Sequence, residues 1–558
     1  SLSEPPSVTG HLITVNSNDF LHVNGGEIRG ECENMWQGIK MEEWSDFHAE
    51  FDAKIQDMWD GIHPAGGDEY YYIINNATFL NNRMGISSNQ TDLGNAFQRV
   101  YNSVFTSNDN FLSPYDGDNF ISWKHIEIRG DESRIAFFRY NELSNAFVGL
   151  DFKSTYPIYP VGYNRIQYNT FENLYLVGVR MINSTNDVIV EQNDFVIESD
   201  PDLSNGLLDQ FLNVYSDFDS EMRIGIDIGR VHEGQYSAYC DFRDNTFTTD
   251  GLDYDFSEDV KRYGIFYSPI SPSYSTSNFS DFARNIYNGM HFGIYIDNDN
   301  GSQRYVENIF TDNKYAIFFN EKSDSYVHIM RCNEFNKTSN TTSTQTYGLF
   351  IEDGSTIGDI GDDTDPHLGN YNKWPVDPSS CGGYPSSYTS NDPKNWDPPS
   401  NWYSIYDENA ANETPSNINY YVFKNVYVGD KSSSSTTDAV YPSSMIQRGT
   451  LPDNNVNAPD DCPTFSLPEF RIGGKMVNSD QLESNIGIYP NPSNGYIKIN
   501  SSDEIDSYGI YSLEGVELKT DKMPLQGRLY FNDLPKGVYM LRLIQINGNV
   551  TSYKLEIL

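Results

Sequence analysis

Acidic and basic residues lie where they could carry out acid–base chemistry on a polysaccharide. An inverting glycoside hydrolase needs two separated carboxyl groups, and Gly361-Asp362-Asp363 supplies a pair. A lyase needs a base near acidic ligands, and Arg180, Arg223 and Lys261 are available. No ordered motif joins them to carboxylates, and the nine histidines include no Gly-His-Gly. The enzymatic interpretation stays open, and a solvated turn is the simpler one for the aspartate pair.

The segment Asp297-Asn298-Asp299-Asn300-Gly301 places alternating oxygen ligands before a glycine, as at the start of a calcium loop. The glutamate that completes such a loop in bidentate fashion is missing from its sequence position. The segment is therefore either a calcium site built on Asp297 and Asp299 or an ordinary Asn/Asp turn. No other cofactor is predicted.

Four aromatic residues share one spacing: Phe266, Tyr295, Phe318 and Phe350 each lie two positions after a Gly or Ala. Aromatic rings stack on sugar rings, and a large exposed apolar patch usually marks an interaction site. These residues are candidates for glycan binding if they share one exposed face.

The element that must position these residues is a short recurring unit. It reads Asn-x-aromatic, a few polar residues, and then a small residue followed by Ile, Val or Leu. Clear copies are Asn169-Thr170-Phe171 with Gly178-Val179, Asn285-Ile286-Tyr287 with Gly293-Ile294, and Asn308-Ile309-Phe310 with Ala316-Ile317. Short apolar runs rich in β-branched and aromatic residues favour strands over helices. Such a repeat indicates a solenoid.

Like residues lie over like in a solenoid of parallel strands, because each strand stacks about 4.8 Å from its equivalent. An Asn at a turn can then bond the backbone above and below, and Gly permits the backbone angles of a tight corner. Strand alternation places the first residue after each Gly inside and the second outside. The predicted outward column is polar and then aromatic: Lys40, His63, Ser87, Asp151, Arg180, Asp227, Phe266, Tyr295, Phe318 and Phe350. The aromatic half is either open to a ligand or covered by residues 366–463.

The repeat resembles the right-handed parallel β-helix superfamily of pectate lyases, polygalacturonases and tailspikes over roughly residues 11 to 365. The resemblance implies an all-β solenoid, which we assign to residues 1–365, and brings no catalytic motif. An irregular cap is predicted at 366–463, where Pro, Ser, Asn and Trp dominate, and a linker at 464–483. An acidic insertion runs from Ser199 to about Met222, and such insertions often build the binding face of a solenoid.

The composition limits the classes of molecule that the protein is expected to bind. The formal net charge is −42, which repels nucleic acid and anionic lipid surfaces. Aromatic residues make up 14% of the chain, which argues against disorder. No apolar run of about 18 residues occurs, so no transmembrane segment is predicted. The opening Ser1-Leu2-Ser3-Glu4 lacks Met and an apolar signal core, which suggests a processed or excised piece of a precursor.

The five cysteines are Cys32, Cys240, Cys332, Cys381 and Cys462. They form no Cys-x-x-Cys pair, which argues against zinc and redox motifs. An odd number in an exported protein leaves at least one thiol unpaired or paired outside the chain. Cys381 and Cys462 flank an irregular segment and are predicted to form a disulfide.

Residues 484–558 form short strands separated by turn residues, which predicts a small immunoglobulin-like β-sandwich. The segment contains, in order, Tyr489, Pro490, Asn491, Pro492, Gly495, Gly515, Gly537, Tyr539 and Lys554. These residues resemble the motifs of the type A C-terminal sorting domain of the type IX secretion system, used by Bacteroidota. The resemblance implies export through the periplasm and across the outer membrane, with the translocon, its shuttle protein and a sortase as partners.

The sequence therefore predicts a secreted or cell-surface β-helix protein. Its solenoid is interpreted as a binding or adhesive module for glycans or surface partners. Two alternatives stay open: a polysaccharide lyase or glycoside hydrolase that acts on the β-helix face, and a passive structural spacer.

Overall fold

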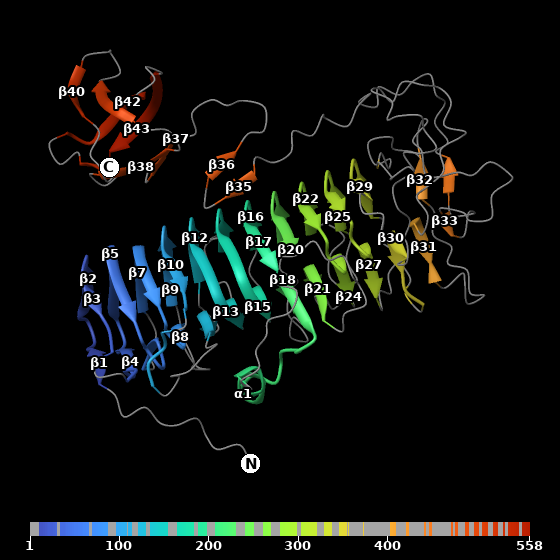
Figure 1. Ribbon diagram of the computed structural model, residues 1–558, viewed down its shortest axis with the longest axis horizontal. Helices are drawn as coiled ribbons and strands as arrows, with labels where there is room; N and C mark the ends of the chain where they lie inside the picture. Colours follow the sequence, from blue (N-terminus) through green and yellow to red (C-terminus); the bar gives the residue numbers. More distant parts are fainter. Residues whose placement is uncertain are drawn as a thin grey trace. The chain divides into compact units, whose positions relative to one another are not determined.

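The computed structural model describes residues 11–353 apart from short breaks, then Ser355, Asn372 and a series of strands (Figure 1). The breaks fall at 31–33, 66–69, 88–95, 109, 114–120, 130–133, 154–163, 183–187, 198–206, 230–239, 250–259, 269–279, 298–302, 321–327 and 338–344. The chain divides into two compact units, Ser1–Phe465 and Ser466–Leu558.

The first unit is a parallel β-helix, as the repeats predict, in which three stacks of strands follow the chain (Figure 1). The glycine-bearing stack contains β1 (Leu12–Val15), β4 (Gly38–Met41), β6 (Ile62–Pro64), β8 (Met84–Ser87), β11 (Ser122–Arg129), β13 (Glu142–Lys153), β15 (Thr170–Ile182), β18 (Met222–Ile228), β21 (Lys261–Tyr267), β24 (Phe292–Asp297), β27 (Tyr315–Asn320) and β30 (Thr346–Ile351). Each strand pairs in parallel with its equivalent in the next coil.

The other two stacks complete each coil. The second contains β2 (Phe20–Asn24), β5 (Ser45–Gln56), β7 (Tyr70–Leu80), β9 (Ala96–Tyr101), β12 (Arg134–Arg139), β14 (Asn164–Gln167), β16 (Val188–Glu191), β19 (Cys240–Arg243), β22 (Ser280–Ala283), β25 (Gln303–Val306) and β28 (Ile329–Arg331). The third contains β3 (Glu27–Ile28), β10 (Val104–Thr106), β17 (Asp194–Ile197), β20 (Thr246–Thr249), β23 (Ile286–Asn288), β26 (Ile309–Thr311) and β29 (Glu334–Asn336). Long strands such as β5 and β15 turn the corner between two stacks.

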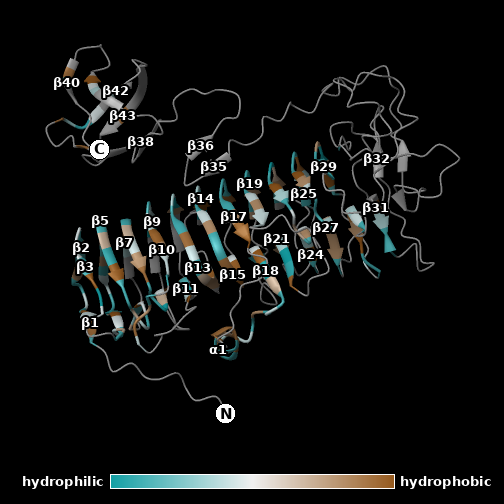
Figure 2. Ribbon diagram, viewed as in Figure 1, coloured by the Kyte–Doolittle hydropathy of each residue, from teal (hydrophilic) through white to brown (hydrophobic). Residues whose placement is uncertain are grey.

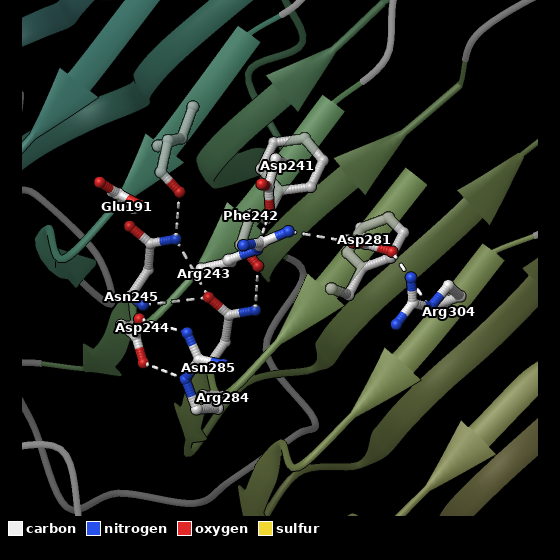
Figure 3. Close-up of polar contacts among 12 residues, drawn as sticks. Glu191, Asp241, Phe242, Arg243, Asp244, Asn245, Asp281, Arg284, Asn285 and Arg304 are labelled. Carbon is white, nitrogen blue, oxygen red and sulfur yellow. Dashed lines mark hydrogen bonds and ion pairs between the residues drawn. The ribbon is translucent and has the colours of Figure 1, made fainter. Parts of the chain in front are cut away.

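A ladder of buried asparagines marks one corner of successive coils from Asn141 to Asn372. Its members are Asn141, Asn169, Asn193, Asn245, Asn285, Asn308, Asn333 and Asn372. From Asn141 to Asn333, each Nδ2 donates to the Oδ1 of the next member at 2.8–3.1 Å. Asn245, for example, also donates its Nδ2 to Val190 O at 2.8 Å and its backbone N–H to Asn285 Oδ1 at 3.0 Å (Figure 3). The prediction that each side chain bonds the backbone on both sides is confirmed in part, because it bonds backbone groups of the preceding coil and reaches the following coil through the next asparagine side chain.

An aromatic ladder fills the interior next to the asparagines. Phe171, Phe195, Phe247, Tyr287, Phe310 and Phe335 stack in that order with ring centroids 4.7–5.1 Å apart. This stacking explains the repeated glycines differently from the corner angles expected above. A Cβ on Gly225 would lie 2.7 Å from the Phe247 ring, and one on Gly264 would lie 2.6 Å from the Tyr287 ring. The close approach of the next coil therefore requires Gly at these positions. Backbone angles are the reason less often, because among the described glycines of these repeats only Gly38 and Gly61 have positive φ.

The parallel stacking continues beyond residue 365. Strand β31 (Trp402–Asp407) pairs in register with β30, and β33 (Val440–Tyr441) pairs with β31. Strands β32 (Tyr420–Val422) and β34 (Ile446–Arg448) form a separate parallel pair. Part of the segment predicted as a cap thus adds coils to the solenoid. The rest of that segment, with Cys381 and Cys462, lies outside the described residues, and Cys332 is disulfide-bonded.

The second unit contains antiparallel sheets. One contains β37 (Ile486–Tyr489), β38 (Tyr496–Ser501) and β41 (Arg528–Tyr530), and the other contains β40 (Glu517–Lys522), β39 (Ile505–Tyr511), β42 (Gly537–Gln545) and β43 (Val550–Ile557). Tyr539, Leu541 and Leu543 are buried at alternate positions of β42. The predicted linker at 464–483 includes an antiparallel hairpin of β35 (Phe470–Ile472) and β36 (Lys475–Val477).

We expect Phe310→Ala to lower the free energy of unfolding by about 3–5 kcal/mol, because it opens a cavity in the aromatic ladder. Phe310 is 2% exposed and stacks on Tyr287 and Phe335. Urea denaturation followed by circular dichroism measures the change. Phe20→Ala is the control, since Phe20 is 70% exposed and should change stability by less than about 0.5 kcal/mol. A cost below about 1 kcal/mol at Phe310 would contradict the ladder.

Candidate functional site

The outer face of the glycine-bearing stack carries the candidate site. Residues two positions after the glycine position stack in register along this face: Ser87, Glu127, Asp151, Arg180, Asp227, Phe266, Tyr295, Phe318, Phe350 and Tyr406. We call this series the outer column. Phe318 and Phe350 pack in a hydrophobic cluster on this face, separate from the interior cluster that holds Ile265 and Ile317. The side chains therefore alternate in and out as the sequence predicts.

The second half of the outer column is a continuous stack of aromatic rings. Its members Phe266, Tyr295, Phe318, Phe350 and Tyr406 have centroids 5.0–5.4 Å apart and planes within 17° of parallel. A neighbouring column, one residue before the glycine position, contains Tyr263, Phe292, Tyr315 and Tyr347, with centroids 4.7–5.1 Å apart. We call these nine residues the aromatic array.

The array is partly exposed. Phe318 and Phe350 are each 6% exposed because other rings surround them, whereas Phe266, Tyr295 and Tyr406 are half-buried. The first four outer members are predicted by the sequence, but Tyr406 is not, because it lies in the segment predicted as a cap. The neighbouring column is not predicted either, because regular alternation does not place the residue before the glycine outside.

The first half of the outer column, together with Lys124 from the position before the glycine, is a strip of largely buried charges. Lys124 Nζ contacts Glu127 Oε1 at 2.7 Å and Asp151 Oδ2 at 2.5 Å, and all three side chains are fully buried. Arg180 contacts Asp227 at 3.3 Å in the next coil. Lys124 and Glu127 are not predicted from the sequence, because their coil has His125 at the position where the repeat has glycine. The signal was available in the alternation of Ile126 and Ile128 with polar residues.

The acidic insertion covers this strip. Its helix α1 (Leu207–Val214) carries hydrophobic and hydrophilic residues (Figure 2) and buries Phe211 against Trp123 and Phe147, with centroids at 5.8 and 4.7 Å. The residues after the helix continue the cover. The Tyr215 ring lies 3.7 Å from Lys124 Nζ, and the Phe218 ring lies 3.8 Å from the Arg180 guanidinium.

Burial and neighbouring charges shift the pKa values of Lys124 and Asp227 in the strip. Burial disfavours the charge on Lys124, but Asp151 and Glu127 outweigh it and raise the Lys124 pKa above its ordinary value. Burial raises the pKa of Asp227 to about 6, against the opposing effect of Arg180. Lys124 is therefore held as an ammonium ion and cannot accept a proton as a base in this arrangement.

The other basic candidates are not gathered into a site. Arg180 is 4% exposed and donates to Asp217 Oδ2 and Asp217 O, both at 3.0 Å. Arg223 is buried and donates to the backbone carbonyls of Ser220 and Met222 at 2.8 and 3.0 Å. Lys261 is exposed. The Asp362-Asp363 pair lies outside the described residues.

The calcium prediction stays open. Asp297 accepts hydrogen bonds from Ser268 Oγ at 3.0 Å and from Asn320 Nδ2 at 2.9 Å, so neighbouring coils use its carboxylate. Asp299 lies in a break of the described chain. Among the described residues, no three His, Cys, Asp or Glu side chains gather in a way that could hold a metal ion.

A second charged ladder, shown in Figure 3, lies on the second stack and at the asparagine corner. Arg243 contacts Asp241 at 2.5 Å and Asp281 at 3.1 Å, and Arg304 contacts Asp281 at 3.4 Å. At the corner, Arg284 donates to both oxygens of Asp244 at 2.7 and 2.8 Å. Burial raises the pKa of Asp241 to about 6, against Arg243. These carboxylates are paired with arginines and link successive coils.

The second unit positions several of the predicted sorting residues. Tyr539 is buried on β42, and its hydroxyl donates to Pro535 O at 2.6 Å. Gly537 begins β42, Lys554 lies opposite Met540 in the β42–β43 ladder, and Tyr489 ends β37. The other residues of the motif, Pro490, Asn491, Pro492, Gly495 and Gly515, lie outside the described residues.

Residues 487–557 match the family model of the secretion system C-terminal sorting domain. The protein is a cargo of the type IX secretion system. This cargo protein is thus directed to the cell surface or the extracellular space. Comparisons with curated proteins and with solved structures give no significant match. Within the part of the chain that the structure describes, no helix is long and apolar enough to cross a membrane.

Lys124→Ala should lower the free energy of unfolding by about 3–5 kcal/mol, because it leaves Glu127 and Asp151 buried without their common cation. The matched control is Lys40→Ala. Lys40 contacts Glu42 at the same 2.7 Å, but its side chain is 36% exposed, so the expected change is below about 1 kcal/mol. Urea denaturation at pH 7 measures both. Equal effects of the two substitutions on stability would contradict the burial of these charges.

Proposed function

We propose that the exported solenoid is a glycan-binding module and that the aromatic array is its binding surface. The observation that carries the proposal is the array itself, since nine aromatic residues line one outer face and several of them are only half-buried. Aromatic rings offer apolar surface to sugar rings, and tyrosine adds a polar tip that can bond to hydroxyl groups. A passive spacer has no need of such a surface.

The enzymatic alternative rests on the charged strip, which lies in the same outer column as the array. Glu127 and Asp151 meet at one lysine, and acid–base catalysis on sugars uses paired carboxyl groups. The strip lies under Tyr215 and Phe218, however, and its lysine is charged. We therefore favour binding without turnover. New reducing or unsaturated ends after incubation with glycans would favour the enzyme instead.

Export proceeds, in this proposal, through recognition of the sorting domain by the translocon and its shuttle protein, followed by a sortase. The two units are compact separately, and solenoid coils depend chiefly on their neighbours.

Deletion of residues 484–558 should leave the solenoid folded and strand it in the periplasm. Cell fractionation and surface proteolysis measure its location, and resistance of the periplasmic fragment to limited proteolysis measures its folding. The full chain with Lys40→Ala is the control and should reach the surface. A folded truncated protein at the surface would contradict the sorting role.

Tyr295→Ala should weaken glycan binding about tenfold or less, the loss expected for one or two aromatic contacts. Tyr295 is half-buried in the middle of the array, whereas Phe318 is largely buried, so Phe318→Ser should also lower stability. A glycan array followed by calorimetry measures affinity, and thermal unfolding checks each variant. Unchanged affinity of a folded Tyr295→Ala protein would remove the array from the binding site.

A further inference from the structure

The array repeats along the solenoid with the period of the coil. In the outer column each ring pairs in register with the ring of the next coil, from Phe266 through Tyr295, Phe318 and Phe350 to Tyr406. The centroid separations are 5.0, 5.1, 5.0 and 5.4 Å. A compact ligand would contact one or two coils, whereas a polymer laid along the axis would contact every coil in a similar way.

The rings of the array also pack closely on one another. Rings within a column are nearly parallel, while rings of the same coil in the two columns meet edge to face at 78–88°. Each ring is therefore fixed by neighbours in two directions, and a ligand would order few side chains on binding. Such preorganisation lowers the entropic cost of association.

The charges near the array are of both signs, and the net charge of the chain disfavours an acidic polymer. Burial, and after it the nearby carboxylates of Glu408 and Glu352, raise the pKa of Tyr315 above its ordinary value. Asp219 acts in the same direction on the pKa of Tyr263, again after burial. Lys314 lies 5.4 Å from the Tyr315 ring, so the surroundings are mixed rather than basic. With a formal net charge of −42, the whole chain repels polyanions.

The covered strip limits the array at one end. The outer column changes from Asp227 to Phe266 between β18 and β21, and the α1 insertion lies over the charged side of that change. The aromatic part of the outer column then runs from Phe266 to Tyr406, and the backbone register continues it to Tyr441 in β33. A ligand on this face has a defined starting point and a finite length of contact.

From these observations we infer that the array binds an uncharged, extended polysaccharide chain that lies along the solenoid axis and contacts successive coils. This inference rests on the proposed function and names its ligand class. Affinity should rise with chain length by roughly threefold to tenfold for each further coil contacted. It should level off once the chain spans the array. A uronic-acid chain of equal length should bind more weakly.

The test is calorimetric titration of the full chain with size-graded oligosaccharides from cellulose, xylan and mannan, and with oligogalacturonates of the same lengths. Affinity that rises with length and then levels off, for an uncharged series only, supports the inference. Equal affinity for short and long chains, or stronger binding of the uronates, overturns it while glycan binding stands. No binding of any series overturns both the inference and the proposed function.

Two variants test the position and direction of the chain. Phe266→Ala removes the end of the outer column and should cost a long chain only one contact. Tyr295→Ala interrupts the column and should lower the affinity of long chains more than that of short ones. The matched control is Tyr140→Ser. Tyr140 is 44% exposed, does not belong to the array, and stacks on Tyr168 with ring centroids 4.9 Å apart. A loss at Tyr140 equal to that at Tyr295 would overturn the location, provided that circular dichroism shows all three variants folded.

Discussion

The hydrogen bond from one asparagine side chain to the next is the constraint on which the solenoid from Asn141 to Asn372 depends. Each ladder amide is buried, so its donors and acceptor must be satisfied inside the protein. They are satisfied only when the next coil places its own asparagine at the same corner, as Asn193 and Asn245 do across an insertion. From Asn141 to Asn333 the residue before each ladder asparagine, such as Gln192 or Asp244, has positive φ, which bends the chain into this corner.

The fixed corner determines what faces inward and outward. Two residues after the asparagine comes the interior aromatic ladder, and its rings lie so close to the neighbouring coil that Gly225 and Gly264 have no room for a side chain. Strand alternation from that glycine turns Ile265 inward and Phe266 outward. The spacing of the outer array is therefore inherited from the asparagine ladder, and each coil adds one more ring at nearly the same distance.

The repeated corner made much of this fold predictable from sequence. The Asn-x-aromatic unit was sufficient to predict the stacking of Phe310 between Tyr287 and Phe335, since all three lie at one position of the repeat. Prediction failed where a coil departed from the repeat. His125 replaces a glycine and concealed Lys124 and Glu127. The packing of α1 on the strip depends on tertiary contacts that no local period encodes.

The two halves of the outer column are stabilised in different ways. The charged half is covered by other residues, whereas the aromatic half is partly exposed. Charges buried on a sheet need partners on every side, so Lys124 and Arg180 require both the neighbouring coils and the rings of the α1 insertion. Aromatic rings stabilise one another by stacking and need no such cover. An insertion over β11 to β18 is thus required by the chemistry of the first half, whereas the second half can stay partly open. The outer column changes from charged to aromatic residues between Asp227 and Phe266, beyond the part that the α1 insertion covers.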